Sequence, residues 1–175
     1  MFCRLIKQKG VREYLNAAKY VNENKKILKS EFRLFGNIDL NNPSSLRHSE
    51  IKFWKKKNYI KIMKHTDLIT KEIIKSDIIC LPSYGEGMPA SLLEAMYFSK
   101  GIVTTNVNGC REMVKNTYNG YIVPKKNYLS LAKKFIDIIN KPYLINHFGK
   151  NSKKYFERKF STNPYDKMFK IIDSL

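Results

Sequence analysis

The sequence is short of acidic residues and of arginine. It has 15 aspartates and glutamates against 33 lysines and arginines, only six of which are arginine, and its formal net charge is +18. Nucleic-acid surfaces commonly use arginine for bidentate contacts, and the lysines are scattered apart from Lys55-Lys56-Lys57. We therefore attribute the charge mainly to a compositional bias toward Lys, Asn and Ile. A basic face that attracts phosphates or anionic lipid remains the alternative.

Paired cysteines and long apolar runs are also missing. The three cysteines, Cys3, Cys80 and Cys110, are odd in number and widely spaced, which excludes a disulfide framework and a C-x-x-C metal pair. No stretch approaches 18 consecutive apolar residues, so we expect no transmembrane helix. The first residues are too few for a signal peptide and look like the end of a strand. We expect one domain over residues 1–175, in a reducing, cytoplasmic setting.

Hydrophobic periodicity predicts strands that alternate with helices. The expected strands cover residues 32–36, 59–63, 77–81, 101–105 and 120–123. The expected helical segments cover residues 11–24, 51–57, 68–76, 89–98, 110–114, 129–139, 143–160 and 164–175. This alternation predicts an α/β fold with a doubly wound, parallel, Rossmann-like sheet. Because such sheets bind ligands beyond the carboxyl ends of their strands, the loops after each strand are the candidate sites.

The first of these loops contains two cations. Arg4 and Lys9 flank it, and Gly10 opens the helix that follows. Two cations and a helix N-terminus can neutralise a diphosphate. Taken alone, Arg4 and Lys9 are more often ordinary solvated charges.

A second loop, Ser83 to Pro89, contains two glycines and a glutamate before a helix. Gly85 and Gly87 let the backbone approach a ligand closely, and the amides of Gly87 and Met88 precede a helix start that favours phosphate. Glu86 could accept hydrogen bonds from sugar hydroxyls, and Glu94 could hold the paired hydroxyls of a ribose. A lone glutamate at position 94 would more often be a surface residue.

The spacing of the two glutamates changes that balance. Seven residues separate Glu86 from Glu94, within Ser-Tyr-Gly-Glu-Gly-Met-Pro-Ala-Ser-Leu-Leu-Glu-Ala-Met. This segment resembles the Glu-x7-Glu signature of the family 4 retaining glycosyltransferases, which have the GT-B fold. The resemblance extends over nearly the whole chain, from the segment 4–10 to the tail at 158–161. It implies a single GT-B C-terminal domain, with no N-terminal acceptor domain in this sequence.

The resemblance assigns roles to particular residues. It implies that Arg4 and Lys9 bind the diphosphate and that Glu86 contacts the donor sugar, these three forming the catalytic centre. Glu94 would hold the ribose. The remaining residues expected to contact the nucleotide sugar are Gly87, Met88, Pro89, Leu93, Met63 and His65. The sequence has no Asp-x-Asp motif, so metal-independent transfer without a cofactor is expected.

The resemblance also implies a biological role. The donor would be a UDP- or GDP-sugar, and the acceptor a glycan or lipid-linked sugar in bacterial surface polysaccharide synthesis. A separately encoded N-terminal domain would complete the enzyme, which would act in the cytoplasm, peripherally at the inner face of the plasma membrane. One alternative is an inactive gene fragment or an interaction module of a split enzyme. Another is a basic nucleic-acid-binding domain, but no nucleic-acid motif accompanies the charge, so no nucleic-acid partner is expected.

Overall fold

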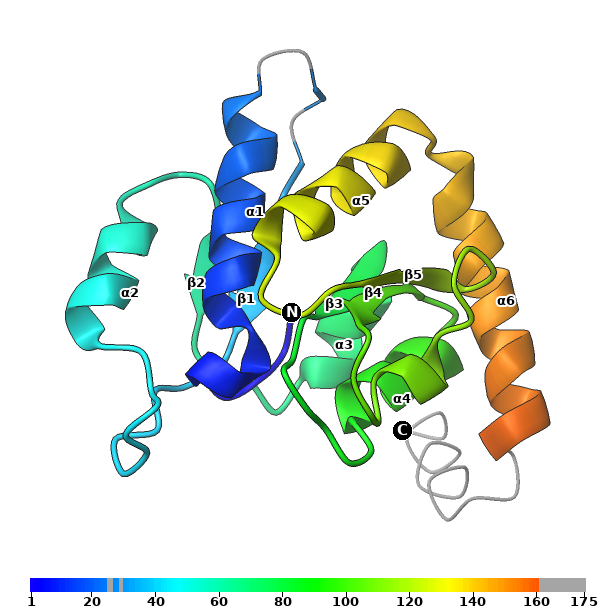
Figure 1. Ribbon diagram of the computed structural model, residues 1–175, viewed down its shortest axis with the longest axis horizontal. Coiled ribbons are helices and arrows are strands. Elements are labelled where there is room, and N and C mark those ends of the chain that lie inside the picture. The colour runs from blue at the N-terminus through cyan, green and yellow to red at the C-terminus, as the bar shows by residue number, and fades with distance from the viewer. Residues whose placement is uncertain (25–26, 29, 161–175) are drawn as a thin grey trace.

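The structure is a computed structural model that describes residues 1–24, 27–28 and 30–160 (Figure 1). It contains five short strands, all paired in parallel. β1 (Arg33–Phe35) pairs with β2 (Lys61–Met63), and a second sheet has the order β3 (Ile78–Leu81), β4 (Gly101–Thr105), β5 (Gly120–Val123). The helix predicted over residues 164–175 lies outside the described residues. Parallel strands that alternate with helices confirm the predicted α/β class.

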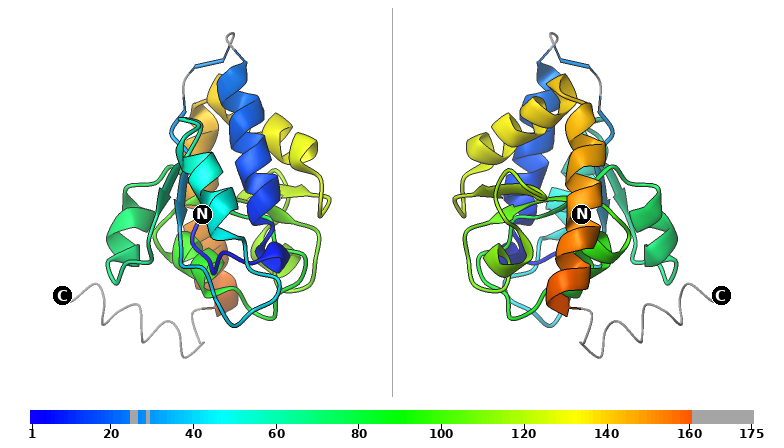
Figure 2. Two further views of the ribbon diagram at one scale, coloured as in Figure 1. Left: turned by 90° about the vertical axis from the view of Figure 1, so that its left-hand side faces the viewer. Right: turned by 90° about the vertical axis from the view of Figure 1, so that its right-hand side faces the viewer.

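The helices cover both sides of the strands. They are α1 (Val11–Glu23), α2 (His48–Lys55), α3 (Ile69–Ile74), α4 (Ala90–Tyr97), α5 (Tyr128–Asn140) and α6 (Tyr143–Phe160), with 3₁₀ turns η1 (Lys7–Lys9) and η2 (Arg111–Met113). α1 packs against α5, and α4 packs against α6 and α3. Figure 2 shows α3 and α5 on opposite flanks of the molecule. No helix in the described part of the chain is both long and apolar enough to cross a membrane.

The core lies between these layers. All five residues of β4 are buried, as are the inward-facing positions of α1 and α4. Strands buried on both faces are nearly continuous in hydrophobic residues. Gly-Ile-Val-Thr-Thr departs from this pattern at its threonines, but the buried hydroxyl of Thr104 is satisfied because it donates to the carbonyl of Leu81. Burial therefore fixes the strands whose carboxyl ends carry the candidate loops.

The predicted single sheet is divided in two. Between the two sheets, Phe2 makes only one parallel bridge, to Phe35. The amide of Cys3 donates to the carbonyl of Phe35 and the amide of Phe35 to that of Met1. This short ladder cannot join the sheets, and Met1 borders a cavity of about 390 Å³ between the beginnings of β1 and β3.

Element boundaries shift where local backbone differs from the hydrophobic pattern. α2 begins at His48, three residues before the predicted start, because the preceding Arg47 is extended (φ −75°, ψ 149°). β2 spans only the last three residues of the predicted strand 59–63. Pro89 is the N-cap of α4 and not its first helical residue. Among the candidate site residues, these shifts affect Pro89, which lies just before α4 instead of in its first turn.

Candidate functional site

The first loop and the loop after β3 meet through an ion pair. Lys9 Nζ lies 2.7 Å from Oε1 and 2.8 Å from Oε2 of Glu86, and the two side chains are only 22% and 10% exposed. Lys9 directly precedes the N-cap of α1, and Glu86 lies three residues before that of α4. The pair therefore links the turn before α1 to the loop before α4, and the N-termini of both helices carry partial positive charge.

The loop after β3 is fastened to η1 by backbone contacts. The carbonyl of Gln8 accepts from the amide of Tyr84 at 2.8 Å and from the hydroxyl of Ser83 at 2.9 Å. Ser83 is fully buried, and its own carbonyl accepts from the hydroxyl of Thr105 in β4. The side of this loop that faces η1 and β4 is thus held in place by hydrogen bonds.

Two glycines permit these contacts. A Cβ at Gly10, which has φ +69°, would lie 1.9 Å from the carbonyl oxygen of Pro82. A Cβ at Gly109 would lie 2.3 Å from the carbonyl oxygen of Gly87 and 2.5 Å from that of Glu86. No L side chain fits at either position. The start of α1 and the loop after β4 therefore pack directly against the backbone of the loop after β3.

A tyrosine and a glutamate add a side-chain contact at the same place. The hydroxyl of Tyr84 donates to Glu13 of α1 at 2.7 Å, and the ammonium of Lys126 lies 5.4 Å from the centre of the Tyr84 ring. Burial and the neighbouring Glu13 raise the pKa of Tyr84. Glu13 Oε2 is buried without a partner within the described residues. Sequence reasoning assigned no role to these side chains, since nothing local links residues 71 positions apart.

Glu94 lies in a different environment from Glu86. It occupies the second turn of α4, half-buried, between Leu93 and Ala95, which are fully buried. Burial raises the pKa of Glu94 from 4.5 to about 7. A carboxyl group at this position is half desolvated, which is a common property of functional carboxyl groups.

Arg4 has a different ion-pair partner from Lys9. The Arg4 side chain is 65% exposed, and its Nη1 lies 3.3 Å from Oδ2 of Asp39 in the loop after β1. It therefore lies at the rim of the site, where its charge is screened by solvent. Lys9 is the cation that the structure pairs with Glu86.

The other predicted ligand-contacting residues divide by exposure. Gly87 and Met88 are exposed, and Met88 has 47% of its surface open to solvent. The side chain of Leu93 is fully buried in the core, so it offers no surface to a ligand. Met63 is half-buried at the end of β2, and the exposed His65 donates its amide hydrogen to Asn37. Pro89 is buried as the N-cap of α4.

The buried cysteines lie beneath this site. Cys80 and Cys110 are at most 2% exposed, and burial raises the pKa of both thiols. They are therefore small hydrophobic residues of the core. Among the residues that the structure describes, no three His, Cys, Asp or Glu side chains are grouped as ligands for a metal ion.

The loops and helix N-termini described above can be compared with known proteins. A family model described as "Glycosyl transferases group 1" matches residues 1–155. The chain belongs to the group 1 glycosyltransferases. This confirms the resemblance carried by the segment from Ser83 to Met96.

Curated relatives of this glycosyltransferase chain include two bacterial sugar transferases. It is 27% identical over 162 residues to the capsular polysaccharide biosynthesis glycosyltransferase CapM of Staphylococcus aureus, covering 91% of this chain and 41% of CapM. It is 31% identical over 153 residues to N,N'-diacetylbacillosaminyl-diphospho-undecaprenol alpha-1,3-N-acetylgalactosaminyltransferase of Campylobacter jejuni, covering 87% and 38%. The chain thus spans about two-fifths of the length of these relatives.

Solved structures support the fold. HepE of Anabaena in complex with UDP superposes with a TM-score of 0.80 at 18% identity, over 99% of this chain and 48% of HepE. TarM superposes with a TM-score of 0.81 at 19% identity, over 97% and 33%. The C-terminal domain of a group 1 transferase from Francisella tularensis gives 0.76 at 20% identity, over 91% and 84%. The glycosyltransferase chain therefore has the Rossmann-like fold of a GT-B C-terminal domain.

Proposed function

We propose that this chain supplies the donor-binding half of a retaining, metal-independent glycosyltransferase. The donor is a UDP- or GDP-activated hexose or N-acetylhexosamine, and the acceptor is a glycan or lipid-linked sugar of a bacterial surface polysaccharide. The observation that carries the proposal is the Lys9–Glu86 pair at the N-termini of α1 and α4. A cation, two sets of helix amides and a carboxylate are the groups that a sugar diphosphate requires.

The chemistry follows from where charge develops. Cleavage of the bond between the anomeric carbon and the diphosphate oxygen leaves negative charge on the departing phosphate. Lys9 and the first-turn amides of α1 and α4 would stabilise that charge, with Arg4 reaching in from the rim. Glu86 would accept hydrogen bonds from the sugar, and Glu94 from the ribose. The two glutamates act here as binding groups and not as a glycosidase acid–base pair.

The relatives support the acceptor class. One carries a name for capsular polysaccharide biosynthesis, and two others are named as transferases acting on diphospho-undecaprenol-linked sugars. A chain with the same role would work in the cytoplasm at the inner face of the plasma membrane. Its acceptor would be held by an N-terminal domain.

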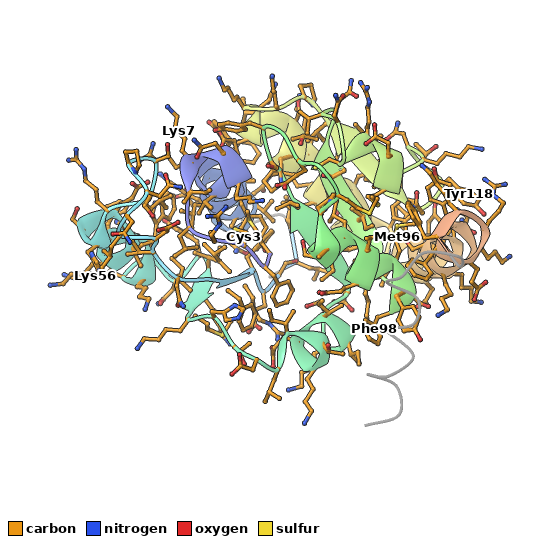
Figure 3. The ribbon with its side chains drawn as sticks, turned by 90° about the horizontal axis from the view of Figure 1, so that it is seen from below. Cys3, Lys7, Lys56, Met96, Phe98 and Tyr118 are labelled. Atoms are coloured by element: carbon orange, nitrogen blue, oxygen red, sulfur yellow. The ribbon has the colours of Figure 1, made fainter. Side chains whose placement is uncertain are left out.

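Calorimetric titration of the full chain tests the donor site. UDP-glucose, UDP-N-acetylglucosamine and GDP-mannose are titrated in turn, and one of them should release heat. Lys9→Gln should weaken that binding by about 1.5–3 kcal/mol, because a charge-assisted contact is lost. Lys7→Gln is the matched control, since Lys7 lies on the same turn η1 but points outward (Figure 3).

The ribose role has its own variant. Glu94→Ala should weaken nucleotide binding by about 1–3 kcal/mol, and the exposed Glu157→Ala on α6 should leave it unchanged. No heat with any of the three donors would refute the proposal and favour an inactive remnant. Equal affinity of wild type and Glu94→Ala would refute the ribose role alone.

A further inference from the structure

Glu86 is held in place by more than its ion pair. Both of its carboxylate oxygens accept from Lys9, at 2.7 and 2.8 Å, and its side chain is only 10% exposed. Its backbone carbonyl lies against Gly109, where even a methyl group would come within 2.5 Å. Glu86 is therefore held beside Lys9 by both carboxylate contacts, and its backbone is packed closely against Gly109. It is a fixed negative charge beside the cation that is proposed to bind the diphosphate.

Lys9 is consequently shared between two kinds of anion. A lysine ammonium has three N–H donors and no acceptor, and Lys9 directs two of them to Glu86. An incoming diphosphate competes for the same ammonium and also meets the negative charge of Glu86 at close range. Because the pair is mostly shielded from solvent, that repulsion is screened less than at the surface.

Donor and spent nucleotide differ at the atoms nearest to Glu86. In the donor, the terminal phosphate is esterified to the sugar, whose hydroxyls can donate hydrogen bonds to Glu86. In the product diphosphate, that phosphate is free, and its second ionisation, at about pH 6, adds nearly one negative charge at neutral pH. The same carboxylate therefore attracts the substrate and repels the product.

We propose that Glu86 distinguishes the donor from the spent nucleoside diphosphate, which it destabilises through its shared contact with Lys9. This inference rests on the proposed donor site and adds to it a role in product release. The wild-type chain should bind UDP-glucose more tightly than UDP. The preference should depend on the negative charge at position 86 and not only on the hydrogen bonds to the sugar.

Titration of UDP and UDP-glucose into wild type, Glu86→Gln and Glu86→Asp tests this. If the guanosine donor is the one that binds, GDP and GDP-mannose replace them. Glu86→Gln removes the charge, so UDP should bind about tenfold more tightly than to wild type, while UDP-glucose binds more weakly. Glu86→Asp keeps the charge but shortens the reach, so UDP affinity should stay near the wild-type value. Glu157→Gln, on the exposed face of α6, is the charge control.

The outcomes are separable. Tighter UDP binding by Glu86→Gln and not by Glu157→Gln supports the inference. Unchanged or weaker UDP binding by a folded Glu86→Gln chain overturns it, even if wild type binds both ligands and the proposed function stands. Failure of the wild-type chain to bind either nucleotide or either sugar donor removes the proposed function, and the inference with it.

Discussion

The loop between β3 and α4 has two faces that differ in almost every respect. Its inner face is fastened by the carbonyl of Gln8, by Glu13 and by close backbone contact with Gly10 and Gly109. On its outer face, a Cβ added at Gly85 or Gly87 would meet no atom within 4 Å. The inner contacts position the loop, and the outer side is free to receive a ligand. Changes to the inner face should therefore alter stability, and changes to the outer face should alter binding.

The largest change in stability is expected from a glycine substitution at the inner face, and a glycine substitution at the outer face is its control. Gly10→Ala forces a left-handed backbone on a residue with a Cβ and drives that atom into the carbonyl of Pro82, so we expect about 2–4 kcal/mol of destabilisation. Gly85→Ala should change stability by less than about 0.5 kcal/mol, since its Cβ enters open space. Urea unfolding of both variants measures the difference, and equal losses would contradict the distinction.

Glu94 should make stability depend on pH. Its pKa in the fold, about 7, is raised from 4.5 by burial. Its contribution to stability is therefore full below the unfolded value and is lost as pH rises through the folded value. Glu94→Gln should be more stable than wild type at about pH 8, by up to about 3 kcal/mol, and should match it near pH 4.5. Melting temperatures of both chains across this pH range test the prediction. It would be contradicted if Glu94→Gln were less stable than wild type at about pH 8.

The titration of Glu94 should also affect nucleotide binding. A carboxylate accepts ribose hydroxyls better than a protonated carboxyl does. Nucleotide affinity of the wild-type chain should therefore fall as pH drops below about 7, and Glu94→Gln should not show this fall. Calorimetry at several pH values compares the two chains.

Tyr84→Phe removes the hydroxyl that donates to Oε1 of the half-buried Glu13, whose Oε2 already lacks a partner among the described residues. We expect about 1.5–3 kcal/mol of destabilisation. The double variant Tyr84→Phe with Glu13→Leu should recover most of that loss, because two apolar groups need no hydrogen bond. A single variant as stable as wild type would show that the hydroxyl does not fasten the inner face.

Arg4→Ala should have the smallest effect on stability. Its ion pair with Asp39 is exposed at the rim, so the loss should be within about 0.5 kcal/mol. Its effect on donor affinity should be smaller than that of Lys9→Gln, whose cation lies inside the site. A larger effect of Arg4→Ala would mean that Arg4 leaves Asp39 to bind the diphosphate, and Asp39→Asn would then tighten donor binding.

Local patterns in the sequence were enough for most of the fold. β4 and α6 have the bounds that hydrophobic periodicity predicts, and α1 ends one residue early. The segment around Glu86 and Glu94 was sufficient to suggest the family. The sequence was silent where contacts bridge distant residues: it did not predict that Arg4 pairs with Asp39 and assigned no role to Tyr84 or Glu13. The roles predicted for Arg4, Lys9 and Leu93 toward a nucleotide sugar stay predictions.

The sequence by itself determined the alternation of strands and helices, the positions of the loops after each strand, and the motif that these loops contain. These are properties of a few neighbouring residues, set by backbone propensity and side-chain periodicity. Only the tertiary structure decided that Lys9 meets Glu86 across 77 positions, that Arg4 turns to Asp39, and that burial raises the pKa of one motif glutamate while an ammonium binds the other. Charge and burial depend on which surfaces meet in space, and no local pattern specifies that.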